Sequence, residues 1–146
     1  MQKLYDHQKD DLNKVIDCYK SGIKRLVFSA PTGYGKTFLL AHLAHSMRSN
    51  TRMLFVVDRI KLVDQAAKAL AKTGISVGVI QANNTRNTDA RLIVASAQTL
   101  AARSIDVRKF ALIVFDEVHI FRKQYIDLIN HHPKQRFLGL SATPTT

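Results

Sequence analysis

A glycine-rich segment near the start of the chain has the residue types that bind phosphate. Residues 30–37 read Ala-Pro-Thr-Gly-Tyr-Gly-Lys-Thr and stand between an apolar run and a helical pattern. Gly33 and Gly35 would let backbone N–H groups converge on a phosphate, and the following helix would add the positive end of its dipole. Lys36 would supply a charge to the β and γ phosphates of a nucleotide, and the Thr37 hydroxyl could bind Mg²⁺. The alternative is a glycine turn beside a solvated lysine. The predicted nucleotide-binding residues of this loop are Thr32, Gly33, Tyr34, Gly35, Lys36 and Thr37.

Two adjacent carboxylates follow another apolar run. Asp116 and Glu117 come directly after residues 111–115, which are apolar at every position and therefore typical of a strand that is covered on both faces. Ligands of open α/β sheets bind at the carboxyl ends of the strands. We expect Asp116 to hold Mg²⁺, directly or through a water, and Glu117 to orient and deprotonate an attacking water. The alternative is an acidic turn that caps the next helix.

The elements that must position these residues form an alternating pattern. Short apolar runs alternate with helical periodicity between residues 25 and 141, which predicts an α/β fold with a mainly parallel sheet and helices on both faces. The predicted strands cover residues 25–30, 53–57, 75–80, 92–95, 111–115 and 137–140. The predicted helices precede the first strand and cover residues 36–48, 60–73 and 122–130. Residues 81–90 are polar and predict an exposed loop. The sequence has no internal repeat, so we expect one domain over residues 1–146.

The composition narrows the class of partner. Lys and Arg number 22 against 11 Asp and Glu, and the resulting net charge of +11 indicates a polyanionic partner or a missing acidic portion. The 46% apolar content argues against a disordered chain. The longest apolar run, residues 110–115, is far shorter than the roughly 20 residues of a membrane-spanning helix, so no membrane partner is expected. A single cysteine, Cys18, and the lack of a secretory signal predict a reducing, intracellular, cytoplasmic location, with which the nucleoid would be compatible.

Five sequence blocks in a fixed order resemble the first RecA-like lobe of superfamily 2 helicases and translocases of the DExH kind. Residues 30–37 look like motif I, residues 116–119 like motif II, and residues 141–143 like motif III. Residues 55–65 are similar to motif Ia as found in helicase subunits of type I and type III restriction enzymes and in DNA repair translocases, and residues 95–100 look like a later nucleic-acid contact. The resemblance implies a three-layer RecA-like P-loop NTPase lobe that uses ATP and Mg²⁺.

The resemblance also implies roles for residues that spacing alone does not assign. The strand before Ser141 would lie between the strands that precede the two nucleotide motifs, so Ser141 and Thr143 would couple the γ-phosphate state to nucleic acid. His119 would hydrogen bond toward that segment, or would be a histidine satisfied near a loop. Residues 4–8 resemble an adenine-reading segment in which Gln8 recognises the base, the alternative being a surface amide. Tyr5, where the family often has Arg, would stack on adenine or anchor the helix. The implied catalytic set is Lys36, Asp116, Glu117 and His119.

Nucleic-acid contacts are expected beside two of these blocks. A motor that moves along any sequence is held mainly through backbone phosphates, for which hydroxyls, amides and cations suffice. The residues expected to contact nucleic acid are Arg59, Ser96, Gln98 and Thr99. Each of them could instead be a solvated loop residue or a capping residue. The helicase resemblance favours DNA over RNA as the partner.

The sequence therefore predicts the ATP-binding motor lobe of a nucleic-acid helicase or translocase. Such motors hydrolyse ATP between two RecA-like lobes, so we expect this chain to be a fragment that lacks the second lobe and is nearly inactive alone. One alternative is a non-catalytic basic nucleic-acid-binding module, which would explain the charge without ATP. Another is a P-loop small-molecule kinase, which would not need the acidic-His block or the Ser-Ala-Thr segment.

Overall fold

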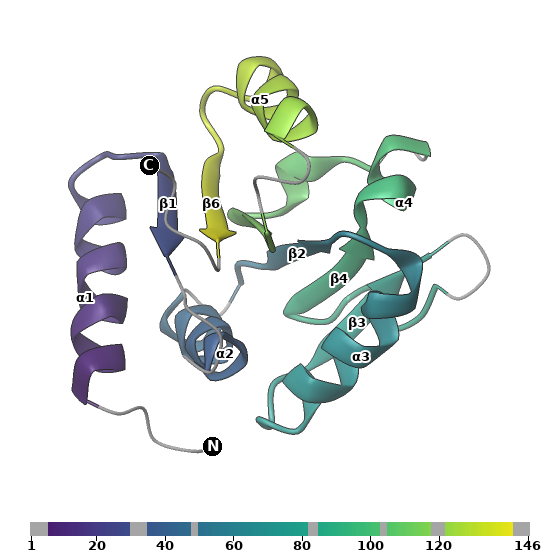
Figure 1. Ribbon diagram of the computed structural model, residues 1–146, viewed down its shortest axis with the longest axis horizontal. Helices are drawn as coiled ribbons and strands as arrows, with labels where there is room; N and C mark the ends of the chain where they lie inside the picture. Colours follow the sequence, from purple (N-terminus) through teal and green to yellow (C-terminus); the bar gives the residue numbers. More distant parts are fainter. Residues whose placement is uncertain are drawn as a thin grey trace.

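A parallel β-sheet forms the centre of the molecule (Figure 1). The computed structural model describes residues 6–29, 35–47, 50–81, 85–102, 105–117 and 122–141. In this part of the chain six strands pair in the order β1-β6-β5-β2-β4-β3, and all neighbours are parallel. The strands are β1 (Arg25–Ser29), β2 (Met53–Val57), β3 (Val77–Ile80), β4 (Leu92–Ser96), β5 (Leu112–Phe115) and β6 (Arg136–Ser141). Their carboxyl ends therefore meet at one edge of the sheet.

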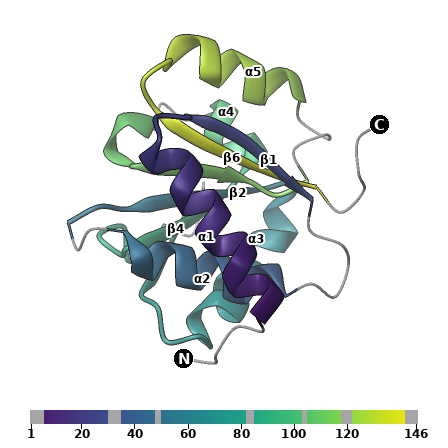
Figure 2. The same cartoon turned by 90° about the vertical axis from the view of Figure 1, so that its left-hand side faces the viewer.

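Helices cover both faces of the sheet, as Figure 2 shows with α2 and α3 on one side and α5 on the other. Side chains of α1, α2 and α3 share one hydrophobic core with one face of the strands, and side chains of α4, α5 and the 3₁₀ turn η1 share a second core with the other face. The helical elements are α1 (Asp6–Lys20), α2 (Lys36–Ser46), α3 (Ile60–Ala71), α4 (Ala97–Ala102), η1 (Val107–Lys109) and α5 (Arg122–His131). The predicted three-layer α/β architecture is confirmed. None of the described helices combines the length and the apolarity that a membrane crossing requires.

The central strands are apolar because both of their faces are covered. Every residue of β2, β4 and β5 is buried, which confirms the prediction made from residues 111–115. Strand β1 lies at the edge of the sheet, and its residues alternate between exposed and half-buried. Val27 is 59% exposed there. Strand β6 lies between β1 and β5, as the helicase resemblance implies.

Several element boundaries differ from the sequence prediction by one or two residues, and the end of α2 has a structural explanation. The helix expected over residues 36–48 ends at Ser46, and Met47 is already extended. Arg91 explains this end, because its side chain donates hydrogen bonds to the carbonyls of Ala44 (2.9 Å) and Met47, which a continuing helix would use itself. The short elements α4 and η1 were not predicted at all.

Candidate functional site

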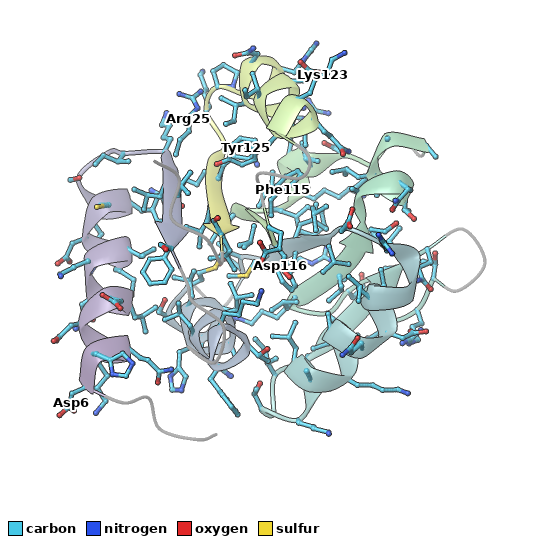
Figure 3. All side chains as sticks on the ribbon, in the orientation of Figure 1. Asp6, Arg25, Phe115, Asp116, Lys123 and Tyr125 are labelled. Carbon is cyan, nitrogen blue, oxygen red and sulfur yellow. The ribbon has the colours of Figure 1, made fainter. Side chains whose placement is uncertain are left out.

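The predicted nucleotide residues that the structure describes gather at the carboxyl edge of the sheet. Strand β1 ends at Ser29 immediately before the phosphate-binding loop, and β5 ends immediately before Asp116. Figure 3 shows Asp116 at the end of the sheet toward which the arrows of β1 and β6 point. The fold therefore brings motifs that are distant in the sequence to one place.

Lys36 is in contact with the acidic pair. Its Nζ lies 2.7 Å from Asp116 Oδ1 and 3.6 Å from Glu117 Oε1. The three side chains are 36%, 21% and 26% exposed, so they are open to solvent and to a ligand. A charge-assisted bond of this length is strong in an apolar setting, but its contribution to folding is modest at such exposure. The arrangement is thus better suited to binding than to holding the fold together.

The backbone around the acidic pair is fixed by the sheet. The Asp116 N–H donates to the carbonyl of Val56, 2.9 Å away, which extends the β5–β2 ladder by one residue. Glu117 then turns sharply, with a φ of +52°. A non-glycine residue in this left-handed region costs about 1–2 kcal/mol, and such local strain often occurs at functional positions.

Gln8 packs against the phosphate-binding loop. Gly35 has a φ of +85° and forms the N-cap of α2, where its carbonyl accepts a hydrogen bond from the Leu39 N–H at 3.1 Å. A Cβ at Gly35 would lie only 2.8 Å from the Gln8 Nε2 atom. Gln8 is 4% exposed although it lies in the first turns of α1. The amide side chain is therefore buried at the place where the resemblance puts the base-recognising glutamine.

Ser141, the described residue of the predicted coupling segment, lies at the same edge, at the end of the strand between the two motifs. Ser141 is the last residue of β6, is 2% exposed and pairs in register with Ser29 of β1. Thr37, in the first turn of α2, is half-buried. The other predicted site residues, together with Tyr5, lie outside the described residues: they are Thr32, Gly33, Tyr34, His119 and Thr143.

The predicted nucleic-acid residues follow two neighbouring strands, β2 and β4, at this edge. Arg59 stands at the N-cap of α3 with a 68% exposed side chain, 3.5 Å from the carboxylate of Asp58. Ser96 and Thr99 are buried, and Ser96 Oγ accepts from the Thr99 N–H (3.1 Å) and donates to Thr99 Oγ1 (2.9 Å). These two hydroxyls therefore stabilise the start of α4, whereas Gln98 is exposed. The contact of all four residues with nucleic acid stays a prediction.

Two residues that help to shape this edge were not predicted. Gln124 of α5 donates from Nε2 to the carbonyl of Ala97 at 3.1 Å and so ties α5 to the start of α4. No pattern in the sequence indicates this contact. Asp58 lies beside the Arg59 guanidinium, and its position directly after the buried strand β2 was a signal that could have identified it.

Comparisons with known proteins identify relatives along the whole chain. The family described as "Type III restriction enzyme, res subunit" matches residues 1–146. The IRC3 protein of Saccharomyces cerevisiae, which is named as a candidate ATP-dependent helicase, is 29% identical over 163 aligned residues that cover 96% of this chain. The chain spans only 23% of the length of that relative.

Solved structures with the same fold include a helicase and an ATPase core. The UvsW helicase of bacteriophage T4 superposes with a TM-score of 0.75 at 20% identity, over 97% of this chain and 53% of that protein. The SWI2/SNF2 ATPase core of Sulfolobus solfataricus, solved in complex with dsDNA, also gives a TM-score of 0.75, at 16% identity, over 98% of this chain and 32% of that protein. The likeness shows that the fold is that of RecA-like helicase lobes, as predicted.

Proposed function

Because the chain belongs to the family of the type III restriction enzyme res subunit, we propose that it is the ATP-binding motor lobe of an ATP-dependent helicase or translocase that acts on DNA. The observation that carries this proposal is the 2.7 Å contact between Lys36 and Asp116, which joins the phosphate-binding loop to the acidic pair. The names of three similar proteins support it, because IRC3 is named an ATP-dependent helicase, UvsW a helicase and the SWI2/SNF2 core an ATPase.

The residues at this edge fit a magnesium nucleotide. Asp116 and Thr37 offer the hard oxygen atoms that Mg²⁺ prefers, and the ammonium of Lys36 beside Asp116 indicates that a cation is favourable at this point. Residues 32–36 would bind the phosphates through backbone N–H groups and Lys36, and Gln8 would recognise adenine. Bound Mg²⁺ would supply neutralisation of the phosphate charge.

The chain's own residues would carry the remaining steps. Lys36 would exchange its carboxylate partner for the β and γ phosphates of ATP. Glu117 would orient the attacking water and take its proton. His119 would connect this site to Ser141 and Thr143, and these residues would report the state of the γ phosphate to the nucleic-acid side. The position of Ser141 in the strand beside both motifs supports this coupling.

DNA would lie along the ends of β2 and β4. The exposed Arg59 and Gln98 would contact backbone phosphates, with Ser96 and Thr99 at the first turn of α4 beside them. Contacts of this kind are independent of base sequence, as a translocating motor requires. ATP and DNA are both intracellular, so we place this activity in an intracellular compartment.

Hydrolysis would need a second RecA-like lobe. We propose that the 146 residues form one domain of a longer protein, since they span about a quarter of the IRC3 length. Arginine fingers from a partner lobe accelerate related reactions by roughly 10³–10⁵-fold. The isolated chain is therefore expected to bind ATP but to hydrolyse it very slowly.

Thermal unfolding with and without Mg-ATP tests the proposal. A ligand at about 100 times its Kd stabilises the native protein by about 2.7 kcal/mol, which raises the Tm by several degrees. We expect this shift for the wild type and for the control Lys72→Ala, at the exposed C-cap of α3, and a much smaller shift for Lys36→Ala, whose affinity is reduced. Equal shifts in all three proteins would contradict a nucleotide site at Lys36. A DNA affinity that changes neither on addition of ATP nor in Lys36→Ala would instead favour a non-catalytic basic module.

A further inference from the structure

A pocket opens at the opposite end of the sheet from Asp116. It has a volume of about 490 Å³, within the range of roughly 300–1,000 Å³ that is usual for ligand pockets. The pocket lies where α1 and α2 end and where β5 and β6 begin. Its wall is largely apolar, and two cations stand beside the apolar side chains. The residues that matter to the argument are Ile16, Leu43, Met47 and Leu112, together with Lys20 and Arg136.

Exposed cations lie at and beside the mouth of this pocket. Lys20 ends α1 and Arg136 begins β6. Lys24 and Lys134 lie in the segments before β1 and before β6, which are neighbours because the Phe137 N–H donates to the Lys24 carbonyl at 2.7 Å. Figure 3 shows Arg25, the first residue of β1, at this end of the sheet, away from Asp116. We name the set the basic rim: it consists of Lys20, Lys24, Lys134 and Arg136, all exposed.

Acidic groups do not neutralise the basic rim. Among the described residues, none of the four cations takes part in an ion pair. The sequence has no Asp or Glu between residues 18 and 57 or after residue 127. Asp17 stands one turn before Lys20 on α1 and forms no ion pair with it. The Arg136 guanidinium lies over the ring of Tyr19, 5.9 Å from its centre, and keeps its charge at the mouth.

The helix ends at the pocket do not reverse this charge. Carbonyls at the end of a helix attract cations when they are open. At the end of α1, the carbonyls of Asp17, Cys18 and Tyr19 accept backbone hydrogen bonds from residues 21–23. At the end of α2, the carbonyls of Ala44 and Met47 accept from Arg91. Several acceptors are thus already occupied, and the cations dominate the mouth.

We propose that the pocket and the basic rim bind an acidic polypeptide segment. One apolar side chain of the segment would enter the pocket, and its Asp or Glu side chains would pair with the basic rim. A polypeptide fits better than duplex DNA, because the outside of a duplex is lined by charged phosphates and offers no large apolar side chain to the wall that Leu43, Met47 and Leu112 form. The surface lies away from the nucleotide edge, so the inference does not depend on the proposed ATP site.

Selection from a phage-displayed library of random 16-residue peptides tests the inference on the 146-residue chain. We expect the enriched peptides to combine several acidic residues with one large apolar residue. Their affinity should fall about tenfold or more in Lys20→Glu/Arg136→Glu, since several charge pairs reverse sign. The matched control Lys68→Glu/Lys72→Glu changes the net charge equally on exposed positions of α3 and should change affinity less than about twofold. Ser46→Trp, which adds bulk at the pocket, should also weaken binding about tenfold.

Three results would overturn the inference. The first is that no peptide is enriched, or that the enriched peptides lack acidic residues. The second is equal binding to the wild type, the rim double variant and Ser46→Trp. The third is that Lys20→Glu/Arg136→Glu weakens the binding of duplex DNA but not the binding of any peptide. If this double variant does not fold, Lys24→Glu/Lys134→Glu replaces it, because both residues are exposed and lie outside the pocket, and the same loss of peptide binding is expected.

Discussion

Lys36 Nζ lies 2.7 Å from Asp116 Oδ1, although 80 residues separate the two in the sequence. The contact connects the loop after β1 with the turn after β5, across the end of β6. The same lysine is 3.6 Å from Glu117. The charge that should bind the phosphates of a nucleotide is therefore held by the carboxylate that should bind its metal ion. Nucleotide affinity should then depend on what else neutralises Asp116.

The Asp116→Asn variant should uncouple ATP binding from Mg²⁺. In the wild type, bound Mg²⁺ would neutralise the phosphates and Asp116, and Lys36 would then be available to the phosphates, so replacing Mg²⁺ by EDTA should weaken binding about tenfold or more, as expected for bonds to charged groups. In Asp116→Asn, Lys36 has lost its 2.7 Å contact with a carboxylate and keeps the longer one to Glu117, so affinity in EDTA should at least equal that of the wild type and the gain from Mg²⁺ should fall below about twofold. Titration with a fluorescent ATP analogue measures both. Asp64→Asn is the control, because Asp64 pairs with Arg86 on the exposed surface. A full Mg²⁺ effect in Asp116→Asn would count against this role.

Gly35→Ala should damage both stability and nucleotide binding. Its φ of +85° strains any side chain, and the new Cβ would lie 2.8 Å from Gln8 Nε2. Gly22→Ala is the matched control, since Gly22 has a φ of +103° but no atom within 4 Å of the added Cβ. We expect both variants to lose about 1–2 kcal/mol of unfolding free energy from backbone strain. Gly35→Ala should lose more and should also weaken ATP binding.

Urea unfolding and nucleotide titration of the two glycine variants check this expectation. The double variant Gly35→Ala/Gln8→Ala should recover the part of the stability that the contact with Gln8 costs. Equal losses in the two single variants, with unchanged ATP affinity in both, would mean that Gln8 does not constrain the loop.

Tyr125→Phe should leave the protein as stable as the wild type or slightly more stable. Tyr125 is 7% exposed and packs edge-on against Phe115 and Phe137, yet within the described part of the chain its hydroxyl has no hydrogen-bond partner. Tyr19→Phe is the contrasting variant, because the Tyr19 hydroxyl donates to the Phe137 carbonyl at 2.6 Å. Its loss should cost about 1–3 kcal/mol. Chemical denaturation distinguishes the two, and a larger loss for Tyr125→Phe would contradict the assignment.

The pH dependence of unfolding gives an independent check on Tyr125. Burial raises the pKa of its phenol from an ordinary value of 10.0 to about 12. The folded state therefore keeps this proton to higher pH than the unfolded state does. The contribution of the Tyr125 phenol to the unfolding free energy is complete below about pH 10 and is lost as the pH rises toward 12. Unfolding free energy measured across this window should fall less steeply in Tyr125→Phe than in the wild type.

Arg59→Ala should weaken DNA binding and reduce its dependence on salt. The Arg59 side chain is 68% exposed at the start of α3, and within the described part of the chain it pairs with Asp58 alone, at 3.5 Å. Removing one phosphate contact should lower the slope of log K against log salt concentration by about 1. Fluorescence anisotropy of a labelled duplex at several salt concentrations measures the slope. The control Arg86→Ala removes an arginine that is paired with Asp64 at 3.0 Å and should change the slope less. An unchanged slope in Arg59→Ala would place the DNA elsewhere.

Much of the fold could be predicted because the central strands are covered on both faces. Continuous apolar runs such as residues 111–115 identified the buried strands, and the helicase resemblance gave the position of β6 between β1 and β5. The family match over residues 1–146 confirms that resemblance. Asp116 could be placed at the carboxyl edge for the same reason, because it follows directly after a buried strand.

Short elements and side-chain contacts were harder to predict. Helix α4 has six residues, too few to establish a helical period, although Ser96 was an available N-cap signal. The end of α2 depends on Arg91, which is distant in the sequence. The left-handed turn at Glu117 and the packing of Gln8 against Gly35 also result from tertiary structure, and no local pattern indicates either of them.

The most direct test of the account is a double-mutant cycle on Mg-ATP affinity, with Lys36→Ala, Asp116→Ala and the double variant measured by isothermal titration calorimetry. If both side chains serve one bound nucleotide, their effects on the binding free energy should be non-additive, with a coupling of about 1 kcal/mol or more. Effects that add to within about 0.5 kcal/mol would contradict the account, because the phosphate-binding loop and the acidic pair would then act on separate ligands.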